Sequence, residues 1–339
     1  MKQLSKGKID TDSLSIKYRR ASIDLENKKI LVTNFHGTEQ EKDFTESANC
    51  DGFGRIRHFK LSESNDWPKN PLPIEPARKA LGLSPTSTLR AQLFQNAACN
   101  WRCWYCYVPF ELLSANPKYS RWLSAAELVE LYLKQRNPPP MIDLSGGQPD
   151  LVPEWVPWMM SELISRGLEK KVFLWSDDNL SNDYFWKYLS KSDIDLIRSY
   201  ENYARVGCFK GFDETSFSFN TRATPNLFNR QFELMKKFLA LGIDLYAYVT
   251  LTSPNNENID SNVCKFIDKL QELDHYFPLR TIPLEIRLYT PVKSRTYDFT
   301  SEAIENQMLA INVWQREIKS RFSDKELSIP ICEVPIGVA

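Results

Sequence analysis

The chain has 339 residues, and 43 Lys and Arg residues balance 43 Asp and Glu residues, so its formal net charge is zero. Because the phosphates of a nucleic acid favour a clearly basic surface, this balance argues against a nucleic-acid partner. Hydrophobic residues make up 42% and charged residues 25% of the chain, as in ordinary globular proteins, and the length suggests one large α/β domain with an appendage, or two domains.

The sequence shows no targeting or membrane segment. Residues 1–13 contain no apolar stretch, and no apolar run reaches the roughly 18 residues that a membrane helix needs. We therefore expect a cytoplasmic protein with no membrane partner. Thiols stay reduced in that compartment, and an odd number of cysteines, seven, is a poor basis for disulfides.

The first 87 residues are predicted to form an N-terminal β-rich extension and a proline-rich connector. Residues 21–25 and 30–35 are apolar segments joined by a polar turn, which indicates a β-hairpin. Residues 67–76 contain four prolines, too many for a helix or a central strand. The basic segment 54–60 is expected to be a solvated strand face, with binding of a substrate phosphate or carboxylate as the alternative.

Strands and helices alternate over residues 88–292, which predicts a parallel sheet with right-handed crossovers. The fold class is therefore α/β, and the number of units favours an open, partial (β/α)6 barrel. A last helix over about 300–321 lies in the C-terminal segment 293–339. The six predicted strands are residues 89–95, 141–145, 171–176, 205–209, 243–252 and 282–290.

Cys99, Cys103 and Cys106 follow the first of these strands with the spacing CxxxCxxC. A structural zinc ion usually takes four ligands in two separated pairs, and this sequence has neither a second pair nor a nearby histidine. Three cysteines on one short loop instead suit an iron–sulfur cluster that keeps one iron open for a substrate or cofactor. Buried, inert cysteines are the remaining alternative.

With the aromatic residue Tyr105 before its last cysteine, this loop resembles the signature of the radical S-adenosylmethionine (radical SAM) superfamily. The resemblance implies a barrel of the radical SAM type in which Cys99, Cys103 and Cys106 hold one 4Fe–4S cluster whose open iron binds SAM. It also implies reductive cleavage of SAM to a radical that abstracts hydrogen, with an electron donor such as flavodoxin or ferredoxin. Tyr105 would contact the adenine of SAM.

A second motif follows the second strand and is similar to the GGE motif of the same superfamily. It consists of Gly146, Gly147 and Gln148, with Gln in place of the usual Glu. The resemblance implies that backbone carbonyl groups of this segment accept hydrogen bonds from the amino group of SAM. Because that contact is made by the backbone, the change at Gln148 weakens the match only slightly.

Three further residues are expected to bind the cofactor. Ser176 and Asp177 end the third strand, where relatives carry small polar residues near the ribose or carboxylate of SAM. Lys210 follows the fourth strand in a segment that resembles the glycyl-radical-enzyme activases, which implies a contact with the SAM carboxylate. Cys208 stands where those activases have Asp, which puts an activase-type cation site in doubt.

The sequence therefore predicts a radical SAM enzyme, of an oxidoreductase or activase kind, that abstracts hydrogen from an unidentified substrate. The substrate classes left open are a small molecule, a peptide and a glycine of a partner protein. The alternative function is a non-catalytic iron–sulfur or zinc protein with a redox or interaction role. The resemblance covers about residues 88–292, and the segments outside it are expected to serve substrate recognition.

Overall fold

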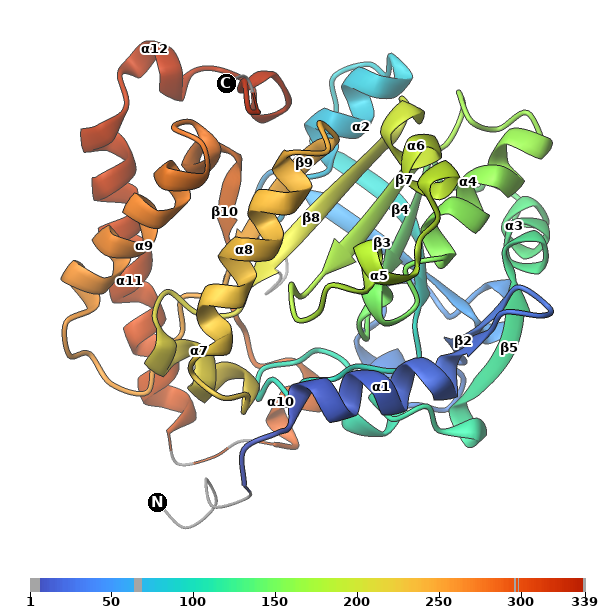
Figure 1. The fold of residues 1–339 in the computed structure, drawn as a ribbon, viewed down its shortest axis with the longest axis horizontal. Helices are drawn as coiled ribbons and strands as arrows, with labels where there is room; N and C mark the ends of the chain where they lie inside the picture. Colours follow the sequence, from blue (N-terminus) through green and yellow to red (C-terminus); the bar gives the residue numbers. More distant parts are fainter. Residues whose placement is uncertain (1–6, 64–68, 296, 298, 338–339) are drawn as a thin grey trace.

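Six parallel strands and one antiparallel strand form the central sheet of the computed structural model, which describes residues 7–63, 69–295, 297 and 299–337 (Figure 1). The order across the sheet is β10-β9-β8-β7-β6-β4-β3, and only β3 runs antiparallel to its neighbour. This sheet confirms the predicted partial barrel. The strands are β3 (Gly54–Lys60), β4 (Thr88–Gln95), β6 (Met141–Ser145), β7 (Phe173–Asp178), β8 (Tyr203–Phe209), β9 (Asp244–Val249) and β10 (Thr281–Pro283).

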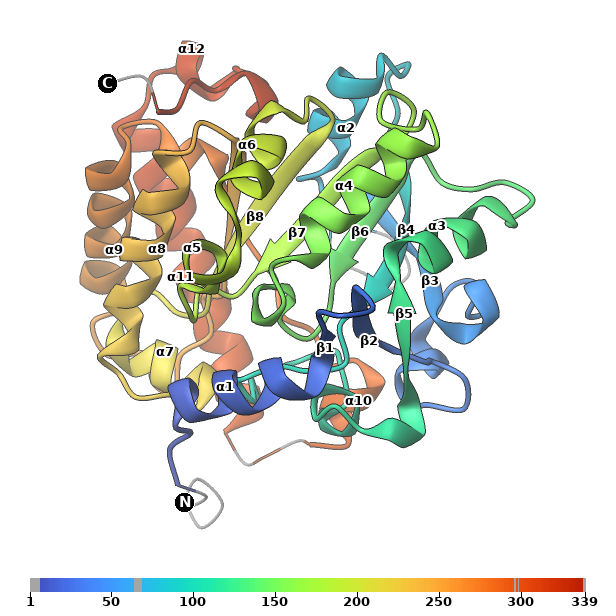
Figure 2. The same cartoon turned by 45° about the vertical axis from the view of Figure 1, so that its right-hand side comes forward.

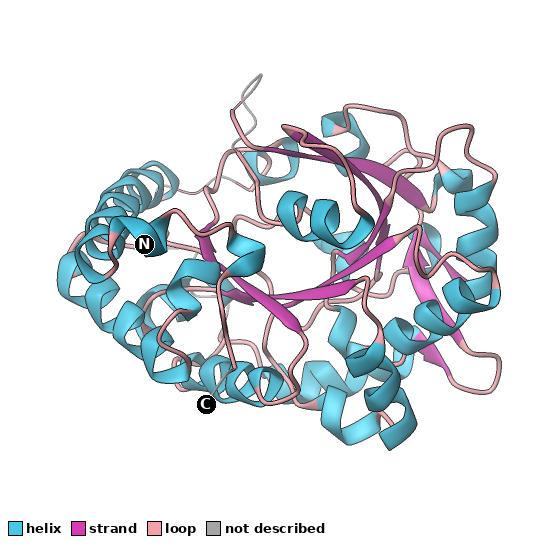
Figure 3. Cartoon of the chain, turned by 90° about the horizontal axis from the view of Figure 1, so that it is seen from above, coloured by secondary structure: helices cyan, strands magenta, loops and turns pink. Residues whose placement is uncertain are grey.

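Helices cover the outer face of this curved sheet, as the view from above shows (Figure 3). The helices predicted between and after the strands are present, with the stretch 182–200 divided into two. None of the helices in the described ranges is both long enough and apolar enough to cross a membrane. The helices are α3 (Ala125–Leu133), α4 (Trp155–Ser165), α5 (Tyr184–Tyr188), α6 (Lys191–Ser199), α7 (Glu214–Thr221), α8 (Leu227–Leu239), α9 (Ile259–Leu273) and α11 (Thr300–Arg321).

The two faces of the sheet have different cores because side chains alternate along each strand. Ile142 and Leu144 belong to the large hydrophobic cluster between the sheet and the helices. Met141, Trp175 and Tyr248 belong to a second cluster on the concave face. We call the concave side the lumen. Many of its side chains at the amino ends of the strands are apolar, and the Asp177 carboxylate lies near the carboxyl end of β7.

The N-terminal region contains the predicted hairpin and a helix that was not predicted. Strands β1 (Ile23–Asp24) and β2 (Lys29–Thr33) pair, and β2 also pairs with β5 (Ser120–Ser124) in a separate three-stranded sheet (Figure 2). The extra helix, α1 (Thr11–Ser22), begins where the Asp10 side chain accepts a hydrogen bond from the backbone of Ser13. Its sequence has no clear apolar stripe, and its stability comes from polar contacts with the rest of the protein.

Two sequence-based boundaries are wrong. Helix α2 (Ile74–Leu81) begins inside segment 67–76, where four prolines had excluded a helix; Pro76 lies in its first turn, where no intrahelical N–H is required. Part of that segment lies outside the described residues. The sixth strand ends at Pro283 rather than at residue 290, and helix α10 (Thr290–Lys293) follows. The last hydrogen bond of this strand to β9 runs from the Leu284 amide to the Val249 carbonyl (2.8 Å).

Candidate active site

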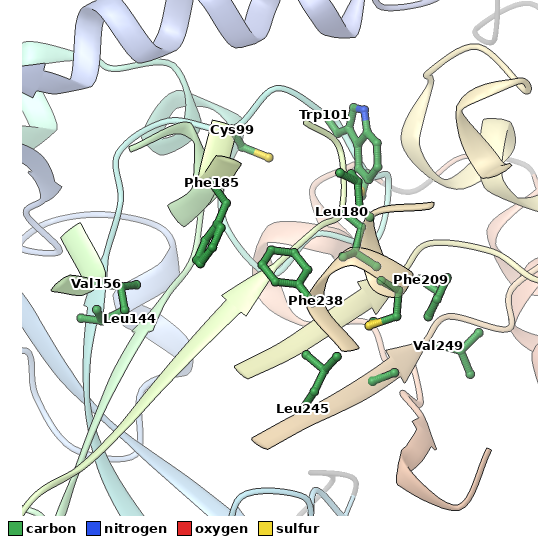
Figure 4. Packing of buried hydrophobic residues seen from close by; sticks show 14 of the residues in the cluster. Cys99, Trp101, Leu144, Val156, Leu180, Phe185, Phe209, Phe238, Leu245 and Val249 are labelled. Carbon is green, nitrogen blue, oxygen red and sulfur yellow. The ribbon is translucent and has the colours of Figure 1, made fainter. Parts of the chain in front are cut away.

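The cysteine loop lies at the carboxyl ends of the parallel strands, directly after β4. Its backbone is fixed by hydrogen bonds from the Cys99 amide to the Leu113 carbonyl (3.0 Å) and from the Trp104 amide to the Asn220 carbonyl (3.2 Å). Cys99 and Trp101 lie at one margin of the buried cluster, far from Leu245 (Figure 4). The loop is thus anchored both to the segment that follows it and to the end of α7.

Helix α1 supports the cysteine loop from outside and crosses the edge where the strands end (Figure 1). The Trp101 indole donates to the Thr11 hydroxyl at 3.0 Å, and the Arg102 guanidinium donates to the Tyr18 hydroxyl at 2.7 Å. Asn100 on the same loop also donates to a serine of α1. These contacts explain why a helix of low hydropathy forms here, and they give the N-terminal region a role in positioning the loop.

The three thiols of the loop share one electrostatic environment. Cys99 and Cys103 are buried and Cys106 is half-buried. Burial raises the pKa of Cys99 and raises that of Cys103 to about 12. The Asn179 amide lies 3.8 Å from the Cys99 sulfur and donates toward it. Across the described ranges, no group of three or more His, Cys, Asp or Glu side chains is arranged to hold a metal ion.

The glycine pair after β6 packs directly against the start of this loop. Gly146 and Gly147 both have positive φ, 62° and 55°, which L side chains rarely adopt. A Cβ atom on Gly147 would lie 2.3 Å from the Asn96 carbonyl oxygen and 2.4 Å from that of Ala98. Within the described part of the chain, no hydrogen bond ends on the carbonyl oxygen of either glycine. The pair therefore combines close approach to the loop with available acceptors.

The side chain of Gln148 is used within the protein. Its amide nitrogen donates to Asp178 at 2.6 Å, and its amide oxygen accepts from the Asn179 backbone at 2.9 Å. Its backbone carbonyl accepts from Asn96 at 2.9 Å. A glutamate at this position would face the Asp178 carboxylate without a proton to share. The departure from the GGE pattern therefore matches a local requirement for a donor at Gln148.

Ser176 and Asp177 point to opposite sides of β7. The Asp177 carboxylate is on the lumen side, where it accepts from the Ser145 hydroxyl at 2.5 Å and from the Trp175 indole at 3.0 Å. The Ser176 hydroxyl is on the helix side and lies 2.7 Å from the hydroxyl of Tyr203. The structure thus brings Asp177 to the site and leaves the Ser176 side chain behind the sheet.

Lys210 and Tyr105 lie together near the cysteine loop. Burial alone would lower the pKa of the Lys210 ammonium, but the neighbouring Cys208, Tyr105 and Cys103 groups outweigh burial and raise it. The Tyr105 hydroxyl lies 3.0 Å from that of Thr250, and burial raises its pKa well above the ordinary value. Lys210 therefore stays charged and can offer its ammonium group to a carboxylate.

Sequence reasoning missed a polar group deeper in the lumen. Arg57 on β3 donates to the fully buried Asp143 on β6 at 3.1 Å. Arg55, two residues earlier on the same strand, shares that electrostatic environment. The basic segment 54–60 is thus a strand of buried and half-buried side chains, and not the solvated strand face that was expected. The strand period of two, applied to its two arginines, could have placed both on one side.

Comparison with known proteins now identifies the family. Residues 96–267 match the model of the radical SAM superfamily, and this range includes the cysteine loop and the glycine pair. The chain belongs to the radical SAM superfamily. Its curled seven-stranded half-barrel is consistent with the partial barrel of the radical SAM fold. No curated protein sequence matches this radical SAM protein detectably.

Two solved structures similar to this radical SAM protein are both of SuiB from Streptococcus suis. The form bound to S-adenosylmethionine has 17% identity and a TM-score of 0.41, over 65% of this chain and 46% of SuiB. The form bound to the precursor peptide SuiA has 14% identity and a TM-score of 0.44, over 75% of this chain and 55% of SuiB. The chain therefore spans about half the length of these structures.

Proposed function

We propose that this radical SAM protein holds one 4Fe–4S cluster through Cys99, Cys103 and Cys106 and uses it to cleave SAM reductively. Its catalytic core would be residues 88–292. The observation that carries the proposal is the contact between two motifs far apart in sequence. Gly147 lies against the Asn96 and Ala98 carbonyl oxygens, so the glycine pair packs against the start of the cysteine loop at one edge of the sheet.

The donor set fits this cluster. Three thiols come from one loop, and the glycine pair beside them leaves acceptor carbonyls that no described residue uses. When bound, the cluster would supply the electron that splits SAM into methionine and a 5′-deoxyadenosyl radical, which takes a hydrogen atom from the substrate. A low-potential donor such as flavodoxin or ferredoxin would deliver that electron.

The chain's own residues would position SAM and exclude water. The carbonyl oxygens of Gly146 and Gly147 would accept from the SAM amino group, while the Lys210 ammonium would pair with its carboxylate. Tyr105 would pack near the adenine, and Asp177 would accept from polar groups of the nucleoside. Gln148 would hold the glycine segment through its bond to Asp178 rather than touch SAM.

The substrate is proposed to be a small molecule, a peptide or a glycine of a partner protein. Abstraction of a hydrogen atom from a glycine of a partner protein would make the protein an activase. Abstraction from a small molecule or a peptide would make it an oxidoreductase or a related enzyme. A stable glycyl radical signal in a co-purified partner would favour the activase. The alternative function, a non-catalytic iron–sulfur or zinc protein, would leave SAM uncleaved.

The deciding experiment measures SAM cleavage. The full chain is reconstituted anaerobically with iron and sulfide and reduced with dithionite, and 5′-deoxyadenosine and methionine are quantified by chromatography. Wild-type protein should form both products. Cys103→Ala should form neither, because two thiols cannot hold the cluster in place.

A matched variant separates the loop from thiols in general. Cys264→Ala removes a cysteine of helix α9, outside the loop, and should retain wild-type product formation and iron content. Equal product formation by Cys103→Ala and wild type would refute the assignment. An iron content near zero with bound zinc would support the zinc alternative instead.

A further inference from the structure

Strand β3 extends the half-barrel beyond its six parallel strands and brings two arginines into the lumen. It pairs antiparallel with β4, so that Arg55 lies opposite Leu93 and Arg57 opposite Ala91. Arg57 reaches across to Asp143 of β6, which places this face of β3 toward the lumen. The strand therefore adds positive charge to the concave side of the sheet.

The two arginines differ in their partners. Arg57 donates to Asp143 at 3.1 Å. No carboxylate of the described residues lies within ion-pair distance of the Arg55 guanidinium, which also donates no hydrogen bond there. The nearby Asp177 is occupied by hydrogen bonds from Ser145 and Trp175. Burial lowers the pKa of Arg55, so its charge is held at a cost that a bound anion would offset.

Two aromatic rings lie close to the Arg55 guanidinium. It lies 5.2 Å from the centre of the Phe44 ring and 5.3 Å from that of Tyr107. Tyr107 directly follows Cys106, so Arg55 lies next to the end of the cysteine loop. A group bound by Arg55 would therefore be held beside the proposed cluster site.

A cleft of about 570 Å³ opens beside this position. It lies across the open seam of the half-barrel, between the segment before β3 and the segment after β10. Its lining includes Phe44 and Tyr289, and the Tyr289 ring contacts Tyr107 at 5.2 Å. Phe44 thus lies near both the cleft and Arg55, and the pair of Tyr289 and Tyr107 connects the cleft with the cysteine loop.

Most of the charged side chains that line the cleft are basic. Lys42, Arg287 and Lys293 line it, with Asp43 as its one acidic residue. Asp43 accepts two hydrogen bonds from Thr290 across the seam, at 2.9 and 2.6 Å. Arg287 is paired with both Glu285 and Glu63, so the cleft offers an anion several basic side chains without a net positive charge.

We propose that the substrate of this site carries a carboxylate or phosphate group, which enters through the seam cleft and is bound by Arg55. The inference rests on the proposed function and adds the class of substrate. Arginine suits this task because its planar fork donates two parallel hydrogen bonds to an oxyanion. Arg57 is already paired with Asp143, so Arg55 is the arginine of this pair that can bind the anion.

The test measures binding of two probes, succinate and inorganic phosphate, to the full chain by isothermal titration calorimetry. Wild-type protein should bind at least one probe. Arg55→Gln should weaken that binding at least tenfold, and Arg55→Lys should fall in between because it keeps the charge but loses the fork. Tighter binding of succinate would indicate a carboxylate substrate, and tighter binding of phosphate would indicate a phosphorylated one.

The control is Arg316→Gln, which removes an exposed arginine of helix α11 and should leave probe binding unchanged. Thermal melting of each variant checks that it is folded. Equal binding by wild type and Arg55→Gln, or no binding of either probe to wild type, would overturn the proposal. Competition between SAM and the probe would also overturn it, because it would assign Arg55 to the cofactor.

Failure of the substrate inference can be distinguished from failure of the proposed function. Probe binding is measured without reduction or turnover. If the reconstituted protein fails to cleave SAM but Arg55→Gln still loses the probe, the proposed function fails and the anion site stands. If SAM is cleaved but the probe binds independently of Arg55, the enzyme assignment stands and the substrate class falls.

Discussion

Two arginines on opposite faces of the sheet, the buried Arg205 and the half-buried Arg55, both lie among aromatic rings but have different charge partners. Arg205, on the helix side of β8, donates to Asp178 at 2.9 Å and also to Asp150. Arg55, on the lumen side of β3, has no carboxylate partner within the described ranges. Aromatic rings flank both guanidinium groups. Aromatic neighbours alone therefore do not identify an arginine with a structural role. The presence of carboxylate partners does.

The largest expected effect is the difference in stability between variants of the two arginines. Arg205→Met should lower the free energy of unfolding by about 3–5 kcal/mol, because it leaves two carboxylates buried without their cation. The matched change Arg55→Met should cost about 1 kcal/mol or less, since it strands no partner. Urea denaturation monitored by circular dichroism measures both. Similar losses for the two variants would remove the distinction between a structural and a ligand-binding arginine.

A second substitution tests the hydrogen bond from Gln148 to Asp178 on the helix side of the sheet. Gln148→Glu should destabilise the protein by about 2–3 kcal/mol at pH 8, because it sets a carboxylate against Asp178 where an amide now donates at 2.6 Å. The loss should shrink as the pH falls and one carboxyl group takes up a proton. Gln148→Met, which removes the donor without adding charge, is the control. If Gln148→Glu matched wild type at pH 8, the donor role of Gln148 would be wrong.

On the lumen side, the protonation of Asp143 should make the stability of the protein depend on pH. Burial, and then the nearby Asp177, raise the pKa of Asp143 to about 7, whereas its ordinary value is 3.8. At pH values between 3.8 and about 7, Asp143 is therefore protonated in the folded protein and ionised in the unfolded chain. The free energy of unfolding should consequently fall as the pH rises from about 4 to 7. Asp143→Asn should flatten this slope, measured by urea denaturation across that range. The exposed Asp260→Asn should leave the slope unchanged, and an unaltered slope in Asp143→Asn would contradict the assignment.

The smallest effect separates the two faces of β7. Ser176→Ala removes one hydrogen bond to Tyr203 and should cost about 1 kcal/mol of stability while SAM cleavage continues. Asp177→Asn should instead slow SAM cleavage, because its carboxylate faces the lumen. Chromatographic product assays and denaturation curves measure the two responses. Impaired cleavage in a stable Ser176→Ala variant would return Ser176 to the cofactor site.

The strands and the cysteine loop were predictable because each is encoded locally. The buried strands around Ile142 and Leu174 are short apolar runs bounded by turn residues, and the helices between them carry capping residues such as Ser124. The three-cysteine spacing is contained within one loop. Helix α1 escaped prediction because its stability depends on partners about 80 to 90 residues away, such as the indole of Trp101.

The sequence by itself determined the order of strands and helices, the partial barrel and the two motifs that identify the superfamily. Only the tertiary structure decided which face each polar side chain takes and which charges are paired. Ser176 and Asp177 are adjacent in sequence yet lie on opposite faces of one strand, and Arg55 and Arg57 share a face yet differ in partners. Whether a charged side chain has an ion-pair partner depends on residues of other strands that are far away in the sequence. A local sequence pattern does not encode such contacts.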